Sequence, residues 1–394
     1  MTNKLLTYTA ATLMALGTTA QAQQGVTDDT VKIGVQTDLS GPLATWGVFA
    51  TNGVRLRFDQ ANEAGGVHGR MIKLFVEDTK YEVPMAARAT NKLVQRDGVF
   101  AMLMGAGTSQ TLASMKILDS KGIPNLFPLT GAASMTEPFN RLHFSQFASY
   151  RDGVIAGLRH FAEGGAKKVC VQSVANEFGE EVNAGVAIAV EQNDLEVVYK
   201  GSHKVTETDF AGVATAIKNT DCEVLAMGSA IKDSITLYAT LRQLGWDKPM
   251  LGSMVPYTPI VAAAGDGKLT EGMYVASSVL STNLEGSEVD LESLDEDLQA
   301  FAKAYEAAYG EPATLQAQMG YVAADLTVLA LENAGRDLTV DALISGIEQI
   351  TEYNDIFGGP TLSFGPDKHA GGDGFVMVQS QGGDWVVVET DLPY

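Results

Sequence analysis

The sequence predicts an α/β protein built from two doubly wound parallel sheets, one in each of two lobes. Short apolar runs alternate regularly with longer stretches of helical periodicity, which is typical of βαβ units with right-handed crossovers. This alternation begins near residue 31 and begins again after residue 147. The chain has 394 residues, of which 45% are hydrophobic, so it is long enough and apolar enough for two cores.

The first unit runs from residue 31 to residue 128. A strand is expected at 31–35 and a helix at 46–64, in which apolar residues recur every three or four positions. The glycine pair at 65–66 ends this helix. The other elements expected in this unit are strands at 71–78, 99–104 and 123–128, and helices at 85–96 and from 109 onward.

The same order of elements restarts with a helix at 150–163. The strands expected in the second unit are 168–174, 195–200, 224–229 and 250–253, and the helices are 180–192, 210–218 and 233–244. After a further strand at 273–280, the chain is mainly helical, at 294–309, 315–334 and 340–350. Residues 374–389 read as a β-hairpin with its turn at 381–384.

The strands at 142–147 and 273–280 lie between units and are expected to cross from one lobe to the other. Lobes that are joined by several chain segments can rotate but cannot separate, which is a hinge arrangement. The predicted division places 23–144 and 278–350 in lobe 1. Residues 145–277 and 351–394 are placed in lobe 2.

Residues 1–22 are expected to be a secretory signal peptide. Lys4 precedes a short apolar core, and Ala20-Gln21-Ala22 forms a small-x-small cleavage site, so the mature chain would begin at Gln23. The alternative is a disordered tail. No cysteine follows the apolar core, which argues against a lipid anchor, and no later stretch has the ~20 apolar residues of a membrane span. These features predict a soluble protein of a bacterial periplasm.

The formal net charge of -21 argues against binding to nucleic acid or to anionic lipid, because both require a cationic surface. It suits a soluble protein that stays monomeric. The acidic run at 285–298 is interpreted as a solvated loop and helix start, where carboxylates are favourable.

The two cysteines, Cys170 and Cys222, have two interpretations. Both lie at predicted strands, and each can be a separately buried small hydrophobe, which is the interpretation that the sequence favours. A disulfide is the alternative in an exported protein, but the distance between the two Cα atoms that it requires cannot be determined from a sequence.

Motifs of the common enzyme classes are missing from the sequence. There is no nucleophile elbow, no phosphate-binding P-loop, and no histidine or cysteine spacing that suits a metal. Gly105-Ala106-Gly107 begins like a dinucleotide fingerprint, but Gln110 stands where a third glycine is needed. The sequence therefore predicts a protein that is not an enzyme and needs no cofactor.

The loops that connect a strand to the next helix, which we call corners, are more informative. Ligands bind at the carboxyl ends of such strands in doubly wound sheets. Gly107, Thr108 and Ser109 open a helix, where free N–H groups favour a carboxylate, although plain helix capping is the alternative. The corner at 128–133 ends at the same edge of the sheet. Trp46 follows the first strand, and either a pocket or a core position suits it.

Several segments, in this order, resemble the type I periplasmic solute-binding proteins of ABC importers, in the leucine/isoleucine/valine-binding branch. They are VKIGVQTDLSGPLATWG, GVRLRFDQANEAGGVHGRMIKLFVEDT, NKLVQRDGVFAMLMGAGTSQTLA, IPNLFPLTGAA, NEFGEE and LSFGPDKHAGGDGFVMVQ. They cover nearly all of the mature chain. The resemblance implies a two-lobed binding protein that closes on a small ligand and hands it to a membrane permease.

The resemblance also implies roles for residues. Lobe 1 would hold the ligand's carboxylate with Gly107, Thr108 and Ser109 and with the second corner, and Trp46 would wall the pocket. Phe178 would close from lobe 2, where amino-acid binders often have Tyr. The second corner comprises Leu129, Thr130 and Gly131, and the other candidates in lobe 2 are Tyr150, Ser229, Met254 and Tyr257.

One departure from the family pattern concerns the ligand's charge. The position that commonly holds an α-ammonium matches Ser253 or Met254, and neither is acidic. A buried ammonium without a counter-charge is costly, so either another acid serves or the ligand lacks this group. The sequence favours the second reading, an apolar or aromatic carboxylate or amide, with Met254 and Tyr257 near its apolar body. Tyr150 either offers its hydroxyl to the cleft or packs at the hinge.

Overall fold

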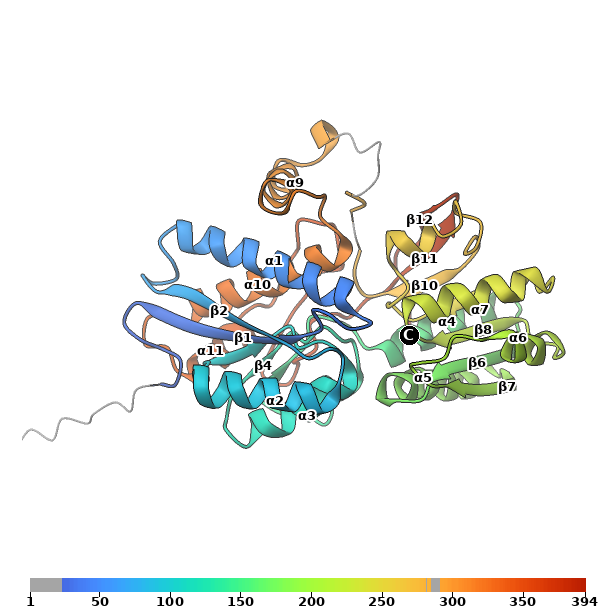
Figure 1. Ribbon diagram of the computed structural model, residues 1–394, viewed down its shortest axis with the longest axis horizontal. Helices are drawn as coiled ribbons and strands as arrows, with labels where there is room; N and C mark the ends of the chain where they lie inside the picture. The colour runs from blue at the N-terminus through green and yellow to red at the C-terminus, as the bar shows by residue number, and fades with distance from the viewer. Residues whose placement is uncertain (1–22, 281, 285–290) are drawn as a thin grey trace, which may run out of the picture.

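The computed structural model describes residues 23–280, 282–284 and 291–394 (Figure 1). It confirms the predicted fold class, because two lobes each contain a mainly parallel sheet between helices. The predicted signal peptide at 1–22 and residues 285–290 of the acidic run lie outside the described residues.

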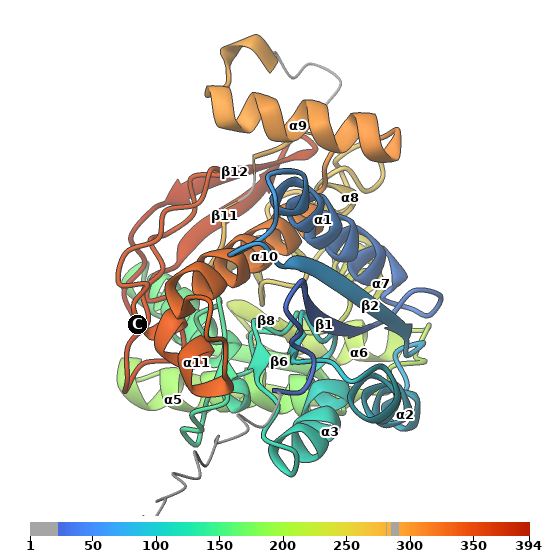
Figure 2. The same cartoon turned by 90° about the vertical axis from the view of Figure 1, so that its left-hand side faces the viewer.

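Lobe 1 contains a parallel sheet in the order β2–β1–β3–β4–β5. Its strands are β1 (Thr30–Thr37), β2 (Met71–Asp78), β3 (Ala101–Leu103), β4 (Asn125–Leu126) and β5 (His143–Phe144). One face is covered by α1 (Ala44–Glu63), α10 (Leu315–Ala334) and α11 (Val340–Glu348), and the other by α2 (Val83–Lys92) and α3 (Thr108–Asp119). A helix α9 (Glu296–Tyr309) lies beside α1 (Figure 2).

Lobe 2 repeats the order in β7–β6–β8–β9–β10 and adds an antiparallel hairpin at the β10 edge. Its strands are β6 (Lys168–Val174), β7 (Glu196–His203), β8 (Val224–Gly228), β9 (Met250–Gly252), β10 (Tyr274–Ser277), β11 (Val376–Gln381) and β12 (Asp384–Glu389). Its helices are α4 (Tyr150–Glu163), α5 (Glu177–Asn193), α6 (Ala211–Lys218), α7 (Ile231–Gln243) and the short α8 (Pro259–Ala262). The hairpin at the C-terminus confirms the predicted turn.

The close packing of α1 on α10 depends on two glycines. A Cβ atom added at Gly53 would lie 1.9 Å from the backbone oxygen of Ala317, and one at Gly320 would lie 1.9 Å from that of Ala50. Real Cβ atoms do not approach oxygen so closely, so any larger residue would push the helices apart. This contact packs α1, near the start of lobe 1, on a helix that is more than 250 residues later in the chain.

The chain crosses between the lobes within the described residues after β5, after β10 and after α11 (Figure 1). Before the third crossing ends, residues 369–371 run beside Ser145, whose N–H donates to the carbonyl of His369 at 2.9 Å. Phe364 and His369 fall in the stretch assigned to lobe 2 from the sequence, and both rings pack against Phe144 of β5. The first and third crossings therefore lie side by side at the hinge.

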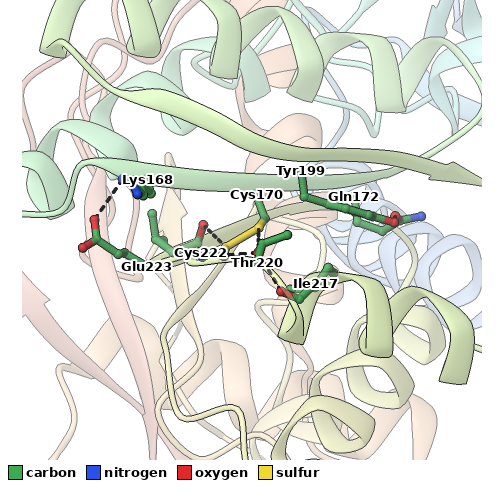
Figure 3. Close-up of a disulfide and its surroundings, with 9 residues drawn as sticks. Lys168, Cys170, Gln172, Tyr199, Ile217, Thr220, Cys222 and Glu223 are labelled. Atoms are coloured by element: carbon green, nitrogen blue, oxygen red, sulfur yellow. Dashed lines mark hydrogen bonds between the residues drawn. A yellow bond between two sulfur atoms is a disulfide. The ribbon is translucent and has the colours of Figure 1, made fainter.

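Cys170 and Cys222 form a disulfide, with Cα atoms 5.8 Å apart (Figure 3). The interpretation that the sequence favoured, two separately buried cysteines, is wrong. Cys170 lies in β6 and pairs in register with Leu225 of β8, so the chain just before β8 passes beside it. This register brings together residues that are 52 positions apart, and a sequence does not reveal it.

Candidate functional site

A cavity of about 560 Å³ lies between the two lobes and is lined by both. Lobe 1 contributes strand–helix corners and the N-terminus of α10, and lobe 2 contributes the starts of α5, α7 and α8 and the loop after β7. The residues that line the cavity are Pro42, Leu43, Thr45, Trp46, Phe49, Tyr81, Ala106, Gly107, Thr108, Leu129, Thr130, Tyr150, Val174, Asn176, Phe178, Val205, Thr206, Glu207, Thr208, Ala230, Ile231, Lys232, Asp233, Val255, Thr258, Pro259, Ile260, Thr314 and Gln316.

The corner after β1 is held by a buried carboxylate. The side chain of Asp38 accepts hydrogen bonds from the backbone N–H groups of Ser40, Gly41 and Leu43, at 3.2, 2.6 and 2.7 Å. The loop is thereby wrapped around Asp38, and α1 begins directly after it at Ala44. The ring of Trp46 is only 6% exposed and forms part of the cavity wall.

A second carboxylate supports this loop from β2. Asp78 accepts hydrogen bonds from Ser40 Oγ at 2.6 Å and from the N–H groups of Leu39 and Lys80, both at 2.9 Å. Desolvation raises the pKa of Asp78, but these hydrogen bonds outweigh it, and the net shift is downward. The loop that presents Trp46 follows β1 and is therefore also tied to the neighbouring edge strand β2.

The N-terminus of α3 faces the cavity through Gly107 and Thr108. Gly107 has φ of 86°, and a Cβ atom there would lie 2.3 Å from Gln110 Oε1, so only glycine fits this turn. Its geometry provides no side-chain cap, and the first N–H groups of the helix therefore remain available to a ligand. The positive end of the helix favours an anion at this point.

Hydroxyl groups connect the corner after β4 to α3 in lobe 1 and to α4 in lobe 2. Thr130 Oγ1 lies 2.7 Å from Thr108 Oγ1. The hydroxyl of Tyr150, at the start of α4, hydrogen-bonds with the Thr130 side chain and the Gly131 backbone. Burial raises the pKa of Tyr150 more than these bonds lower it, so the phenol stays neutral. The ring of Phe178 packs edge-on against Tyr150, with centroids 5.1 Å apart.

Charge is distributed unevenly over the cavity wall. The residues that line it from lobe 1 carry no charged side chain, whereas lobe 2 contributes Glu207, Lys232 and Asp233. Asp233 is 4% exposed, and its Oδ2 lies 3.3 Å from His203 Nε2. The cavity thus has a neutral wall with a positive helix end on one side and a net negative wall on the other.

Three polar contacts join the lobes beside the cavity, and we call them the interlobe contacts. Ser109 Oγ donates to Glu177 at the start of α5. The N–H of Ser134 donates to Glu181 at 3.2 Å. Arg151 of α4 donates to both carboxylate oxygens of Glu137, at 2.7 and 3.0 Å. All three depend on the lobes being close together.

The family model described as periplasmic binding protein matches residues 30–384 of this chain. The chain belongs to the periplasmic binding protein family. This match, together with the relatives below, confirms the resemblance to the type I proteins of the leucine/isoleucine/valine-binding branch. The family model and the relatives named below describe solute-binding proteins, in agreement with the expectation that this one is not an enzyme.

A curated relative is the leucine-, isoleucine-, valine-, threonine- and alanine-binding protein of Pseudomonas aeruginosa, which is 24% identical over 80% of this chain and 81% of its own length. A branched-chain amino acid ABC transporter protein of Thermus thermophilus with bound valine has a TM-score of 0.81 at 19% identity, covering 93% of this chain and 97% of its own. A solute-binding protein of R. palustris in complex with benzoate has a TM-score of 0.79 at 21% identity, covering 92% and 97%.

The structure of this periplasmic binding protein brings seven of the sequence-predicted residues into the cavity wall. They are Trp46, Gly107, Thr108, Leu129, Thr130, Tyr150 and Phe178. Their roles toward a ligand stay a prediction. The strand–helix corners indicated the positions of the residues from lobe 1, whereas Phe178 was expected only from the family resemblance.

The other five predicted residues do not line the cavity. Ser109 turns toward Glu177, and Gly131 lies behind the ring of Tyr150. Ser229 is fully buried and hydrogen-bonds with Ser234 at 2.9 Å. Met254 is buried near Ser278, and the ring of Tyr257 packs against Trp385. The turn after β9 points these two side chains inward, and their neighbours Val255 and Thr258 line the cavity instead.

Several lining residues were not predicted from the sequence. Tyr81 enters the wall because Lys80 and Tyr81 both have positive φ, 51° and 58°, which turns the chain back after β2. Burial raises the pKa of Tyr81 well above its usual range. Glu207 and Asp233 follow strands β7 and β8, so the same corner rule applied to lobe 2 would have found them.

Within the described residues, no group of three or more His, Cys, Asp or Glu side chains could hold a metal ion, and no helix could span a membrane.

Proposed function

We propose that this protein is the substrate-binding component of an ABC importer, which traps a small carboxylate-bearing ligand between its lobes and delivers it to a membrane permease. The ligand is a branched-chain or other amino acid, or an apolar or aromatic acid or amide. The proposal is supported by the family membership, by the cavity between the lobes, and by the relatives whose names describe amino-acid binding or transport.

The observation that carries the proposal is the uncharged wall of lobe 1 around the N-terminus of α3. Gly107 and Thr108 offer backbone N–H groups, and the Thr108 and Thr130 hydroxyls lie 2.7 Å apart beside them. A carboxylate accepts hydrogen bonds from both kinds of donor, and the helix dipole favours its charge. With no acidic side chain in this part of the wall, nothing there repels an anion.

The rest of the wall suits an apolar body. Trp46, Phe49 and Leu129 line it from lobe 1, and Phe178 and Val255 line it from lobe 2. Removing such a group from water contributes about 25 cal/mol for each Å² that is buried. A micromolar dissociation constant corresponds to about -8 kcal/mol, which one anchored carboxylate and one buried apolar group can supply.

In the proposed mechanism, the ligand binds to one lobe first and the hinge then closes the other lobe over it. The ligand docks on lobe 1 at α3, and rotation about the crossing segments then adds Phe178 and the other groups of lobe 2. Only contacts made in the closed state can shift the equilibrium toward it. The interlobe contacts form in the same movement, and the closed form is what the permease would recognise.

The proposed location is the periplasm. The signal peptide predicted at 1–22 would be cleaved before Gln23, the mature protein would carry no lipid anchor, and it would act as a monomer.

The alternative to import is a sensor domain that passes closure to a receptor, and an enzyme that uses the same cleft is a weaker alternative. Uptake by the cognate permease in vesicles, dependent on added binding protein, separates importer from sensor.

A thermal-shift screen of amino acids, aromatic acids and short amides tests the binding function. A ligand present at one hundred times its dissociation constant adds about 2.7 kcal/mol to the stability of the native state. For the ligand found, Thr108→Ala is expected to raise the dissociation constant at least tenfold, because a hydrogen bond to a charged group contributes roughly 1.5–3 kcal/mol.

The matched control is Thr215→Ala, which removes an exposed hydroxyl from α6 that donates only to the carbonyl of Ala211. It should leave the dissociation constant unchanged. Equal weakening by both substitutions would contradict the carboxylate site, and a screen without any stabilising compound would contradict the binding function.

A further inference from the structure

Tyr81 lines the cavity, and its hydroxyl has no hydrogen-bond partner among the described residues. The hydroxyl oxygen is also not sealed inside the protein, so it is open to the cavity. Burial raises the pKa of Tyr81 well above its usual range, so the phenol keeps its proton and can donate it. A desolvated donor without an acceptor costs free energy, and a bound ligand can supply the acceptor.

The ring of Tyr81 lies directly against the turn that opens α3. A Cβ atom added at Gly107 would be 2.7 Å from Cε2 of the Tyr81 ring. The hydroxyl is attached to the ring atom next to Cε2, so it lies near Gly107 and Thr108, which line the same part of the cavity. The phenol therefore stands beside the place where lobe 1 offers its backbone N–H groups.

Gln110 connects this turn to the loop that carries Tyr81. Its Nε2 atom donates to the backbone carbonyl of Tyr81 at 2.6 Å, and because a carbonyl can only accept, this bond fixes the orientation of the amide. Oε1 then faces the turn and would be 2.3 Å from a Cβ atom at Gly107. Gln110 is 4% exposed, so the connection is inside the protein. The position that a dinucleotide fingerprint reserves for glycine here joins two cavity loops.

The loop after β2 needs such support because of its backbone conformation. Lys80 and Tyr81 have φ of 51° and 58°, which is unfavourable for residues with a side chain. The N–H of Tyr81 donates to Thr79 Oγ1 at 3.3 Å, and its carbonyl accepts from Gln110. Side chains thus hold both backbone polar groups of Tyr81. Unfavourable backbone conformations that the surroundings hold in place are common at ligand sites.

We infer that the Tyr81 hydroxyl donates a hydrogen bond to an oxygen of the ligand beside the start of α3, and that Gln110 is the positioning residue that holds Tyr81 there. This inference rests on the proposed function and adds a donor to its site. The hydroxyls of Tyr150, Thr130 and Thr108 form two hydrogen bonds with one another, which use two of their three hydrogens. Tyr81 therefore supplies a second free hydroxyl hydrogen on this side of the cavity.

The test measures dissociation constants by calorimetry at pH 7 with four probes, leucine, phenylalanine, benzoate and 3-phenylpropanoate. The variants are Tyr81→Phe, which keeps the ring, Gln110→Met, which keeps the length of the side chain but cannot donate, and the combination of both. The matched control is Tyr309→Phe. It removes a hydroxyl outside the cavity wall that donates to the carbonyl of Asn52 at 3.0 Å.

For the probe that binds the wild-type protein most tightly, Tyr81→Phe is expected to raise the dissociation constant at least about fivefold, and Tyr309→Phe to leave it unchanged. Gln110→Met should weaken binding in the wild-type background but add little to Tyr81→Phe, because Gln110 acts through Tyr81. Equal dissociation constants for Tyr81→Phe and the wild-type protein would overturn the inference and leave the proposed function intact. An effect of Gln110→Met that is the same in both backgrounds would overturn its positioning role.

A crystal structure of the wild-type protein with the same probe is a second test that needs no variant. Tyr81 Oη is expected within hydrogen-bond distance of a probe oxygen. A bound probe whose oxygen atoms all lie beyond that distance would overturn the inference. If none of the four probes binds the wild-type protein, the proposed function fails and the inference fails with it.

Discussion

At the scale of single residues, the first corner of lobe 1 depends on Asp38. Its side chain is fully buried and accepts three backbone N–H groups of the loop that precedes α1. A carboxylate can accept all of these bonds, whereas an amide would place an N–H₂ group against some of the same donors. The position of Trp46 in the cavity wall follows from this arrangement.

Asp38→Asn is therefore expected to lower the free energy of unfolding by about 1–3 kcal/mol, the cost of leaving buried donors unsatisfied. Urea unfolding measures the change. Asp337→Asn, at an exposed position, is the control and should lie within about 0.5 kcal/mol of the wild-type value. Identical midpoints for the two variants would show that the loop is not held by Asp38.

The sequence could locate the corners but could not say which side chains point into the cavity. Trp46 and Thr108 were found because each lies at the start of a helix that follows a strand. Ser229 and Met254 satisfy the same rule, yet both are buried below the wall, because the turn after each strand sets the direction of its side chains. Lys80 and Tyr81 form a turn with positive φ angles but contain no glycine, so the residue pattern does not predict this turn.

At the scale of elements, regular periodicity predicted helices and strands closely. The expected boundaries of β2, α4, β6 and α10 are the observed ones, because each has a complete apolar face and a clear end. The strands β3 and β4 are shorter than expected, since the chain leaves the sheet early to form the corners. Pairings between distant strands, such as the one that places Cys222 beside Cys170, are long-range contacts, and local patterns do not encode them.

The disulfide is expected to stabilise lobe 2 without affecting the site. It closes a loop between residues 52 positions apart, for which the loss of unfolded-state entropy corresponds to roughly 4 kcal/mol. The double substitution Cys170→Ala and Cys222→Ala should lower the unfolding free energy by about 2–4 kcal/mol. Ligand affinity should not change, because the disulfide lies toward the amino ends of β6 and β8 and the cavity lies at their carboxyl ends.

Calorimetry on the double variant measures the affinity, and denaturant unfolding measures the stability. An unchanged unfolding free energy would contradict the entropic contribution of the disulfide. A large loss of affinity at full folding would contradict the separation between the disulfide and the site.

The contact between α3 and α5 should make closure dependent on pH. The hydrogen bond from Ser109 lowers the pKa of Glu177 below its usual 4.5 when the lobes are together. A carboxyl with a depressed pKa in the closed state stabilises that state above its usual pKa, and the contribution is lost as the pH falls through the depressed value. The ligand-bound, closed protein should therefore open more readily as the pH drops below about 4.5.

Small-angle scattering between pH 7 and pH 3.5 follows this opening. Glu177→Gln should flatten the pH dependence, whereas Glu180→Gln, an exposed neighbour on the same helix, should keep it. The same pH profile in both variants would show that the Ser109–Glu177 contact does not influence closure.

At the scale of the whole molecule, the two lobes are joined by the segments after β5, β10 and α11 and are separated by the cavity. Several connections permit rotation and prevent the lobes from coming apart. The sequence predicted this division because its βαβ pattern restarts. It did not show how the segment from 351 onward runs along β5, since that path depends on rings such as Phe364 packing on Phe144.

If ligand binding closes the hinge, the distance between the two lobes must shorten when the ligand binds. Spin labels at Lys121 of lobe 1 and Lys204 of lobe 2, both exposed and outside the cavity wall, report this distance with and without the ligand found by screening. The distribution should shift to one shorter distance when ligand binds, and the same concentration should shift Thr108→Ala less. A ligand that binds with full affinity and leaves the wild-type distance distribution unchanged would contradict ligand-driven closure.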